Sequence, residues 1–179
     1  RQRQMCIRDS REAFLAIRRE LGALYCGQYM LETTELLTEP GEPGEGLFEQ
    51  LVEALRALAG GAQPVAAVVG FQQALLGECG LMPQLQVCVE CGRRPAGGRE
   101  VYFSAGRGGI ICRDCEPNII EKRRVEPEAV RWCLGGGRTA TGARAAFELL
   151  DYHIAYNAGR RPRLARYVMM YAAGPARQG

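Results

Sequence analysis

The chain has 179 residues and is 47% hydrophobic, which allows one core with a small appended module and excludes disorder over most of its length. No run approaches the roughly 20 apolar positions of a membrane span, and the first residues lack the layout of a secretory signal, so we expect a cytoplasmic protein. The formal net charge of +3 is ordinary and by itself excludes no class of partner.

The N-terminal half predicts three helices. Residues 1–10 show no usable periodicity and support no inference. From Ser10, a suitable N-cap, apolar residues recur every three or four positions and predict a helix. Its expected buried stripe is Phe14, Ile17, Leu21, Leu24, Gln28 and Leu31. A segment at 39–46, rich in Pro, Gly and Glu, breaks the chain, and further helices are predicted over 47–58 and 64–80, packed antiparallel.

The next segment carries two matched cysteine pairs, Cys88-x2-Cys91 and Cys112-x2-Cys115, separated by twenty residues. Each pair offers two thiolates from one tight turn, and Zn2+ favours four such ligands in a tetrahedron. Neighbouring glycines at 92, 108 and 109 allow sharp bends there. We predict a structural zinc site, with a disulfide pair or a redox switch as alternatives. A site filled by four thiolates leaves no open position for chemistry.

Short strands are predicted at 101–103 and 109–111, on either side of a Gly-rich turn. After Pro117 the pattern returns to helix, over 127–134, 141–158 and 164–173. We therefore expect a mainly α fold, a helical bundle with an inserted four-cysteine zinc-ribbon-like β-hairpin module. The expected domains are an uninterpreted segment 1–10, a helical domain over 11–84 and 119–179, and a zinc-binding module over 85–118.

Charge is distributed unevenly along the chain. Residues 1–85 carry seven basic and eleven acidic residues, whereas residues 86–179 carry sixteen basic and nine acidic residues. Arginine outnumbers lysine twenty-two to one, and its planar fork suits phosphate oxygens. The C-terminal half therefore favours contact with nucleic acid, while an ordinary solvated surface explains each single cluster equally well.

The order of motifs resembles a known family. The run Phe71-x3-Leu75-Leu76-x3-Gly80-x2-Pro83-x-Leu85 leads into Cys88-x2-Cys91-Gly92, and Phe103-Ser104 and Gly108-Gly109 precede Cys112-x2-Cys115. This arrangement resembles the C-terminal part of the bacterial recombination mediator RecO, most densely over residues 71–115.

The resemblance implies a DNA repair protein of the RecF pathway that is not an enzyme. Such a protein binds single- and double-stranded DNA, RecR and the acidic tail of the single-strand-binding protein, and it helps to load RecA. It implies a location in the bacterial cytoplasm, at the nucleoid when acting, with no membrane partner and no small-molecule substrate. The family begins with an OB-fold, but residues 1–60 show no series of five alternating strands. We therefore expect no OB-fold in this chain and do not carry over strand annealing.

Roles are assigned to residues as follows. The zinc ligands are Cys88, Cys91, Cys112 and Cys115. The first candidates for DNA contact, because the zinc module would hold their backbone fixed, are Arg93, Arg94, Arg107 and Arg113, followed by Lys122, Arg123 and Arg124. The candidates for a basic rim around the acidic tail are Arg144, Arg160, Arg161, Arg163 and Arg166. His153, the only histidine, lies on an apolar helical face and is expected in the core.

Two other classes of function stay open. The chain could be a zinc-stabilised protein-interaction module without DNA binding, which requires basic residues scattered over all faces. It could also be a fragment of a zinc-ribbon enzyme. An enzyme would need a paired-carboxylate or Cys/His site, and the nearby acidic residues Asp114, Glu116 and Glu121 have no evident partners in the sequence.

Overall fold

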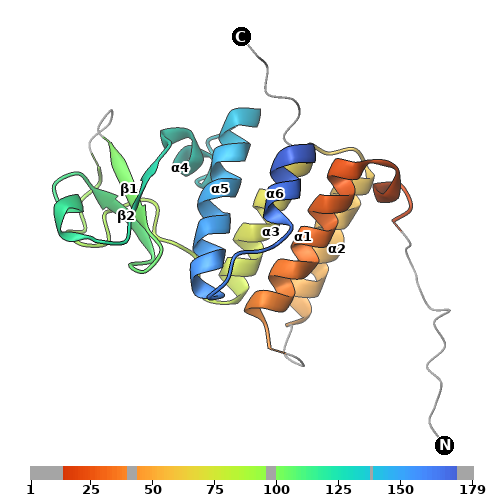
Figure 1. Ribbon diagram of the computed structural model, residues 1–179, viewed down its shortest axis with the longest axis horizontal. Coiled ribbons are helices and arrows are strands. Elements are labelled where there is room, and N and C mark those ends of the chain that lie inside the picture. The colour runs from red at the N-terminus through yellow and green to blue at the C-terminus, as the bar shows by residue number, and fades with distance from the viewer. Residues whose placement is uncertain (1–13, 40–43, 96–99, 138, 173–179) are drawn as a thin grey trace, which may run out of the picture.

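The fold is a helical bundle with a small antiparallel sheet at one end (Figure 1). A computed structural model describes residues 14–39, 44–95, 100–137 and 139–172. Helix α5 (Ala140–Asn157) stands between the sheet and the rest of the bundle, in the centre of Figure 1. The expected mainly α fold with an inserted β module is therefore confirmed.

The first helix begins later than predicted. Ser10 lies outside the described residues, a 3-10 turn η1 covers Ile17–Arg19, and α1 covers Leu21–Leu37. The predicted stripe is wrong for Gln28, which is exposed, and for Leu21 and Leu31, which are 48% and 52% exposed. The face of α1 that packs inward carries Ala23, Cys26, Gly27, Tyr29, Met30 and Thr33. Small residues allow close approach there, since a Cβ at position 27 would lie 3.2 Å from Leu55.

Helices α2 (Glu45–Ala59) and α3 (Pro64–Glu78) agree with the sequence prediction. Pro64 occupies the first turn of α3, and the side chain of Gln63 accepts a hydrogen bond of 2.7 Å from the backbone N–H of Ala66. Helix α3 packs against α1, α2 and α5. Its buried Phe71, Leu75 and Leu76 place it at the centre of the hydrophobic core.

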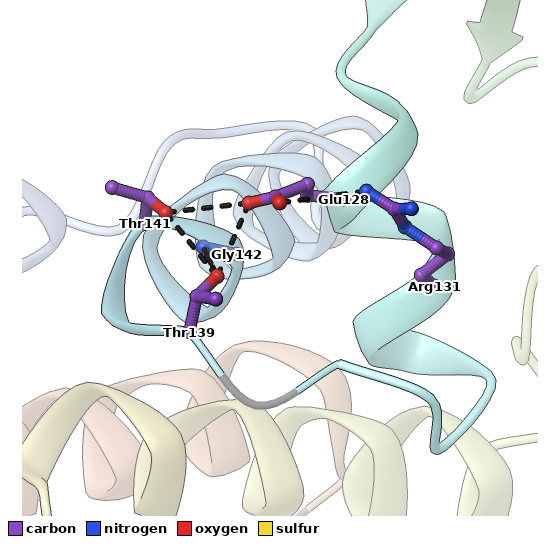
Figure 2. A network of polar contacts seen from close by, with 5 residues as sticks. All are labelled: Glu128, Arg131, Thr139, Thr141 and Gly142. Carbon is purple, nitrogen blue, oxygen red and sulfur yellow. Dashed lines mark hydrogen bonds and ion pairs between the residues drawn. The ribbon is translucent and has the colours of Figure 1, made fainter. Parts of the chain in front are cut away.

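Helix α4 (Pro127–Cys133) is joined to the N-terminus of α5 by a polar network, shown in Figure 2. The hydroxyl of Thr139 accepts a 3.0 Å hydrogen bond from the N–H of Gly142 and so caps α5. The carboxylate of Glu128 accepts from the hydroxyls of Thr139 and Thr141 at 3.1 and 3.3 Å and pairs with Arg131 at 3.4 Å. A negative charge here also complements the positive end of the α5 dipole.

The last helical segment is less regular than predicted. It consists of α6 (Ala165–Tyr167) and a π-helical segment η3 (Val168–Ala172), and position 173 lies outside the described residues. The carboxylate of Glu32 on α1 accepts hydrogen bonds from the backbone N–H groups of Arg163 and Leu164, at 2.7 and 2.9 Å. This contact fixes the start of the segment against the bundle.

The sheet has the order β2-β1-β3. Strands β1 (Val101–Ser104) and β2 (Gly109–Cys112) form the predicted hairpin, with Phe103 opposite Ile110. The third strand, β3 (Arg123–Val125), pairs antiparallel with β1 and was not predicted. Three residues flanked by Lys122 and Glu126 carry too little alternating pattern to indicate a strand.

The sheet rests on α5 through Phe103, which is fully buried. Its ring meets those of Tyr152 and His153 edge-on, with centroids 6.4 and 5.5 Å away. His153 is buried as expected, and its Nε2 lies 2.8 Å from the carbonyl oxygen of Leu81. Among the described residues, we find no helix with the length and apolarity needed to cross a bilayer.

Candidate functional site: the four-cysteine centre and the arginines around it

The four predicted ligand cysteines converge. Their sulfur atoms all lie within 4.8 Å of one another, and those of Cys91 and Cys112 are 3.8 Å apart. Four sulfurs bound at about 2.3 Å to one zinc ion in a tetrahedron would lie about 3.8 Å from one another. The cluster of Cys88, Cys91, Cys112 and Cys115 can therefore hold a metal ion with little movement.

The first cysteine pair is held by a turn whose surroundings direct N–H groups toward both of its sulfur atoms. In the first turn Gly92 has a φ of +70° and donates to the carbonyl of Cys88 at 2.8 Å. A hydrogen bond from the backbone N–H of Arg93, followed by one from its guanidinium, lowers the pKa of the Cys91 thiol to about 6. The N–H of Cys112 lies 3.3 Å from the sulfur of Cys88. These donors favour the thiolate form of Cys88 and Cys91, whereas a hydrogen bond with Cys112 raises the pKa of Cys115 to about 12.

Other cysteines among the described residues have a different environment. Burial raises the pKa of Cys26 to about 12 and that of Cys133 to about 11, so both are neutral thiols in the helical core. Soft donors, thiolate-favouring hydrogen bonds and tetrahedral spacing thus come together at the four-cysteine centre alone within the described chain.

The paired glycines before the second turn serve two separate needs. Gly108 has a φ of +70°, which favours glycine. At Gly109 the need is space, because a Cβ there would lie 2.5 Å from the carbonyl oxygen of Gln84 and 2.6 Å from Val89. The backbone of Gln84 exchanges hydrogen bonds of 2.9 Å with Gly108 and Ile110, so this segment cannot retreat freely.

Replacing Gly109 by alanine should therefore weaken the metal centre. We expect Gly109→Ala to lower metal affinity at least tenfold, because the added methyl group separates β2 from the chain that leads into Cys88. Competition with a chromophoric chelator measures the affinity. Gly70→Ala is the matched control, since a Cβ at that position meets nothing within 4 Å. Equal metal affinity for both variants would contradict the packing argument.

A carboxylate on the chain leading into β3 locks the metal module to α5. Glu121 accepts hydrogen bonds from the hydroxyl of Ser104, the last residue of β1, at 2.7 Å and from the N–H of Gly106 on the β1–β2 turn at 2.8 Å. It also accepts a hydrogen bond from the hydroxyl of Tyr152 on α5. One side chain thus joins the hairpin, the chain entering β3 and the central helix. In the sequence, the only indication of this role is an acidic residue near the cysteines.

Most of the arginines first predicted to contact DNA have acidic neighbours. Arg93 pairs with Asp114 at 3.5 Å, and Arg107 pairs with Glu90 at 3.4 Å. Arg113 pairs with Glu100 at 3.0 Å, and the same carboxylate also pairs with Arg124. Arg93, Arg94 and Arg113 line one cavity of about 120 Å³ beside Cys112. The four-cysteine module therefore brings three of these side chains together and places Arg107 elsewhere.

The three basic residues of the second predicted group, at the start of strand β3, have different partners. Lys122 pairs with Glu116 at 2.5 Å, and Arg124 pairs with Glu100 at 3.2 Å. Arg123 differs, since its guanidinium lies 4.0 Å above the ring of Tyr152. Among the described residues, Arg123 pairs with no carboxylate.

The C-terminal arginines predicted for partner binding are mostly exposed and do not form one cluster. Arg144 pairs with Glu148 on α5 at 3.5 Å, and the guanidinium of Arg166 lies over the ring of Tyr167 at 4.6 Å. Arg160 and Arg163 are exposed. Arg161 lies 3.6 Å from Asp151, a buried carboxylate that the sequence reasoning missed. Its position, four residues after the buried Phe147 on α5, was the available signal.

Most of the chain is similar to proteins of one known family. Residues 18–166 match the family model described as Recombination protein O C terminal. The DNA repair protein RecO of Anaeromyxobacter sp. strain K is 32% identical over 166 residues, which cover 87% of this chain and 65% of that protein. The DNA repair protein RecO of Desulforamulus reducens is 36% identical over 126 residues, which cover 69% of this chain and 48% of that protein.

A third relative, the DNA repair protein RecO of Pelotomaculum thermopropionicum, is 39% identical over 106 residues, covering 58% of this chain and 40% of that protein. The chain thus spans 65% or less of the length of these three relatives. The family model, in contrast, covers most of the chain, including both cysteine pairs and all of α5. The chain therefore belongs to the RecO family and matches the C-terminal region of that family.

Proposed function

We propose that this chain is the DNA-binding helical and metal-binding part of a recombination mediator of the RecF pathway. In this role it binds DNA, RecR and the single-strand-binding protein, helps to load RecA, and catalyses no reaction. The observation that supports DNA binding most is the groove along α5, where exposed arginines from β3 and from the C-terminal segment lie on one face. Membership of the RecO family and the names of its DNA repair relatives support the pathway. A cytoplasmic location belongs to the same proposal.

The metal in this proposal is zinc in a structural role. Four thiolates fit Zn2+, and their number leaves no open coordination position, so the ion would stabilise the module without taking part in chemistry. Cys88, Cys91, Cys112 and Cys115 would hold it. The buried apolar cluster of the module is small, which makes a metal ion the main source of its stability.

Charge indicates which arginines are available for phosphate. Residues 85–118 contain five basic and four acidic residues, so their formal charge is +1. A zinc ion with four thiolates adds −2 and makes the module slightly negative. Residues 119–179 contain eleven basic and five acidic residues, a surplus of six. The groove that contains Arg123, Arg124 and Arg161 is therefore better placed to attract DNA than the loops around the cysteines.

The acidic tail of the single-strand-binding protein is proposed to contact the exposed arginines of the C-terminal segment. Arg160, Arg163 and Arg166 are exposed there, and half-buried apolar residues such as Leu164 and Met169 lie beside them. A basic rim next to apolar side chains suits an acidic peptide that ends in apolar residues.

The enzyme alternative has little support among the described residues. Its three candidate carboxylates are engaged: Asp114 with Arg93, Glu116 with Lys122, and Glu121 with Ser104 and Gly106. Asp114 shares a cavity with Glu100, but each of these two carboxylates is paired with an arginine. The competing proposal is a protein-interaction module without DNA contact. Titration of the chain with DNA distinguishes it from the proposed function.

Titration with fluorescent single- and double-stranded DNA at several salt concentrations tests the proposal. We expect binding that weakens with salt, and each lost phosphate contact should reduce the log–log salt slope by about one. The double variant Arg123→Gln/Arg124→Gln should therefore reduce the slope by about two. Arg19→Gln is the control, because Arg19 is exposed in η1, away from the groove.

A peptide with the acidic tail of the single-strand-binding protein is titrated in parallel. If the metallated chain binds neither DNA nor the peptide, the proposed function is wrong for this chain. If it binds the peptide alone, the interaction-module alternative replaces it. A salt slope that Arg123→Gln/Arg124→Gln leaves unchanged would place the DNA contacts outside the groove.

A further inference from the structure

Helix α5 forms the floor of a groove with two adjoining cavities of about 260 and 320 Å³. Both are lined by Arg123 and Glu148. The smaller cavity also contains Asp151, Arg161 and Met169, and the larger one continues along β3 and α4. The groove therefore lies between the metal module and the C-terminal segment, on the helix that separates them in Figure 1.

Asp151 is an unusual residue for the floor of such a groove, because it is only 3% exposed. Its Oδ1 accepts a 3.0 Å hydrogen bond from the hydroxyl of Tyr29, which in turn accepts one of 2.8 Å from the side chain of Gln72. Burial raises the pKa of Asp151 to about 6, although the bond from Tyr29 and the nearby charge of Arg161 lower it in part. The group is therefore mostly ionised at pH 7, but it takes up a proton at a pH about two units higher than an ordinary aspartate does.

The two arginines of the smaller cavity, Arg123 and Arg161, are held loosely. The side chain of Arg161 is 76% exposed, and its Nε lies 3.6 Å from Oδ2 of Asp151, beyond hydrogen-bond distance. Arg123 rests on the ring of Tyr152 and has no carboxylate partner among the described residues. A phosphate oxygen pair offers a guanidinium two short, charge-assisted hydrogen bonds, which exceed the single long contact that Arg161 makes here.

We propose that this cavity is a proton-linked phosphate site for a nucleic-acid backbone. Arg123 and Arg161 bind one phosphodiester, and Asp151 takes up one proton from solvent as Arg161 moves from the carboxylate to the phosphate. The new carboxyl O–H donates toward the phosphate, while Oδ1 keeps its bond from Tyr29. Loss of the arginine and arrival of an anion both disfavour a charged carboxylate, so binding and protonation strengthen each other.

Asp151 is the group in this region that titrates near neutral pH. The titratable or charged groups that face it among the described residues are Tyr29 and Glu32 of α1, Arg123 of β3, Arg161, and Glu148 and Tyr152 of its own helix. Burial raises the pKa of Tyr29 far above its usual value, and Glu148 pairs with Arg144. Burial also lowers the pKa of His153 below its ordinary 6.5, so this histidine stays neutral in the relevant range.

The site rests on the proposed DNA binding and is tested by measuring DNA affinity between pH 6.5 and 7.5. The assay uses a phosphate-free buffer at fixed salt, because free phosphate would compete and phosphodiesters do not titrate in this range. We expect the wild-type affinity to rise as the pH falls, by up to about tenfold per pH unit for one proton. Asp151→Asn should remove this dependence and should bind DNA more tightly than the wild type at pH 7.5. A purely structural role for Asp151 predicts no gain in affinity.

Arg161→Gln provides a second variant in case Asp151→Asn folds poorly, and circular dichroism and metal content verify both. We expect Arg161→Gln to weaken binding and to lose the pH dependence, whereas Arg19→Gln should retain it. Wild-type binding that is independent of pH, or unchanged affinity in Arg161→Gln, overturns the site and leaves the proposed function standing. Absence of DNA binding by the wild type at every pH overturns both.

Discussion

Replacing Cys112 by serine should abolish stoichiometric metal binding and unfold the module from about residue 85 to 125, while the helical bundle stays folded. The apolar cluster around the cysteines has four buried members, Cys88, Ile111, Cys112 and Ile119, which are too few to hold the two cysteine turns in place. The other buried residues of this segment, among them Phe103 and Ile110, pack against the helical core and depend on the hairpin that the cysteine turns organise. In small zinc modules the metal contributes about 10–16 kcal/mol, so losing one of four ligands removes the main stabilising contribution. Elemental analysis and limited proteolysis measure the two effects.

Cys133→Ser is the matched control for this result. Cys133 is 7% exposed but lies in the helical core, away from the cluster. We expect this variant to keep one zinc per chain and to lose at most about 1–3 kcal/mol of stability from burying a hydroxyl group. Full metal content in Cys112→Ser, or equal protease resistance of the two variants between residues 85 and 125, would contradict the assignment of the four-cysteine centre. A metal-to-protein ratio near zero in freshly purified, reduced wild-type protein would overturn the metal site itself.

Replacing Phe103 by alanine should have the largest effect of any substitution at the contact between the sheet and α5. The side chain is fully buried on the central strand β1 and meets the rings of Tyr152 and His153. Its removal leaves a cavity between two elements that cannot both close over it, which costs about 3–5 kcal/mol. Urea unfolding followed through Trp132, the single tryptophan of the chain, reports the loss.

Phe48→Ala makes the same chemical change on α2, where the ring is 65% exposed. We expect a change within about 0.5 kcal/mol for this control. Similar unfolding midpoints for the two variants would mean that the contact between β1 and α5 contributes little. Metal content should stay unchanged in both, since neither ring contacts a cysteine ligand.

Several parts of the structure were predictable because they depend on spacing along the chain. The cysteine pairs carry their own geometry, and the glycines beside them mark sharp turns, so the metal centre was identified correctly as a cluster. The helices that begin at Pro64 and Pro127 were placed to within two residues of their ends. Local signals fix these elements because caps and turns act on neighbouring residues.

Other parts depended on contacts between distant segments. The stripe predicted for α1 was wrong because Leu21 and Leu31 have the hydrophobicity of core residues, whereas the face that packs inward carries Tyr29 and Met30 beside small residues. Strand β3 exists because β1 offers it an edge, which three residues alone cannot indicate. Asp151 is buried by partners 122 residues away on α1, beyond the reach of any local pattern.

The order of the strands has a consequence for how the protein is assembled. The central strand β1 has β2, which carries the ligand cysteine Cys112, on one side and β3, which supplies a wall of the groove, on the other. In a chain made from the N-terminus, the fourth cysteine emerges before β3 does, so the metal can organise the hairpin before the groove wall arrives. A chain starved of metal would be synthesised in full and would still lack its groove. Metal supply during synthesis would then set how many copies acquire the groove proposed to bind DNA, even though the metal site lies outside the groove.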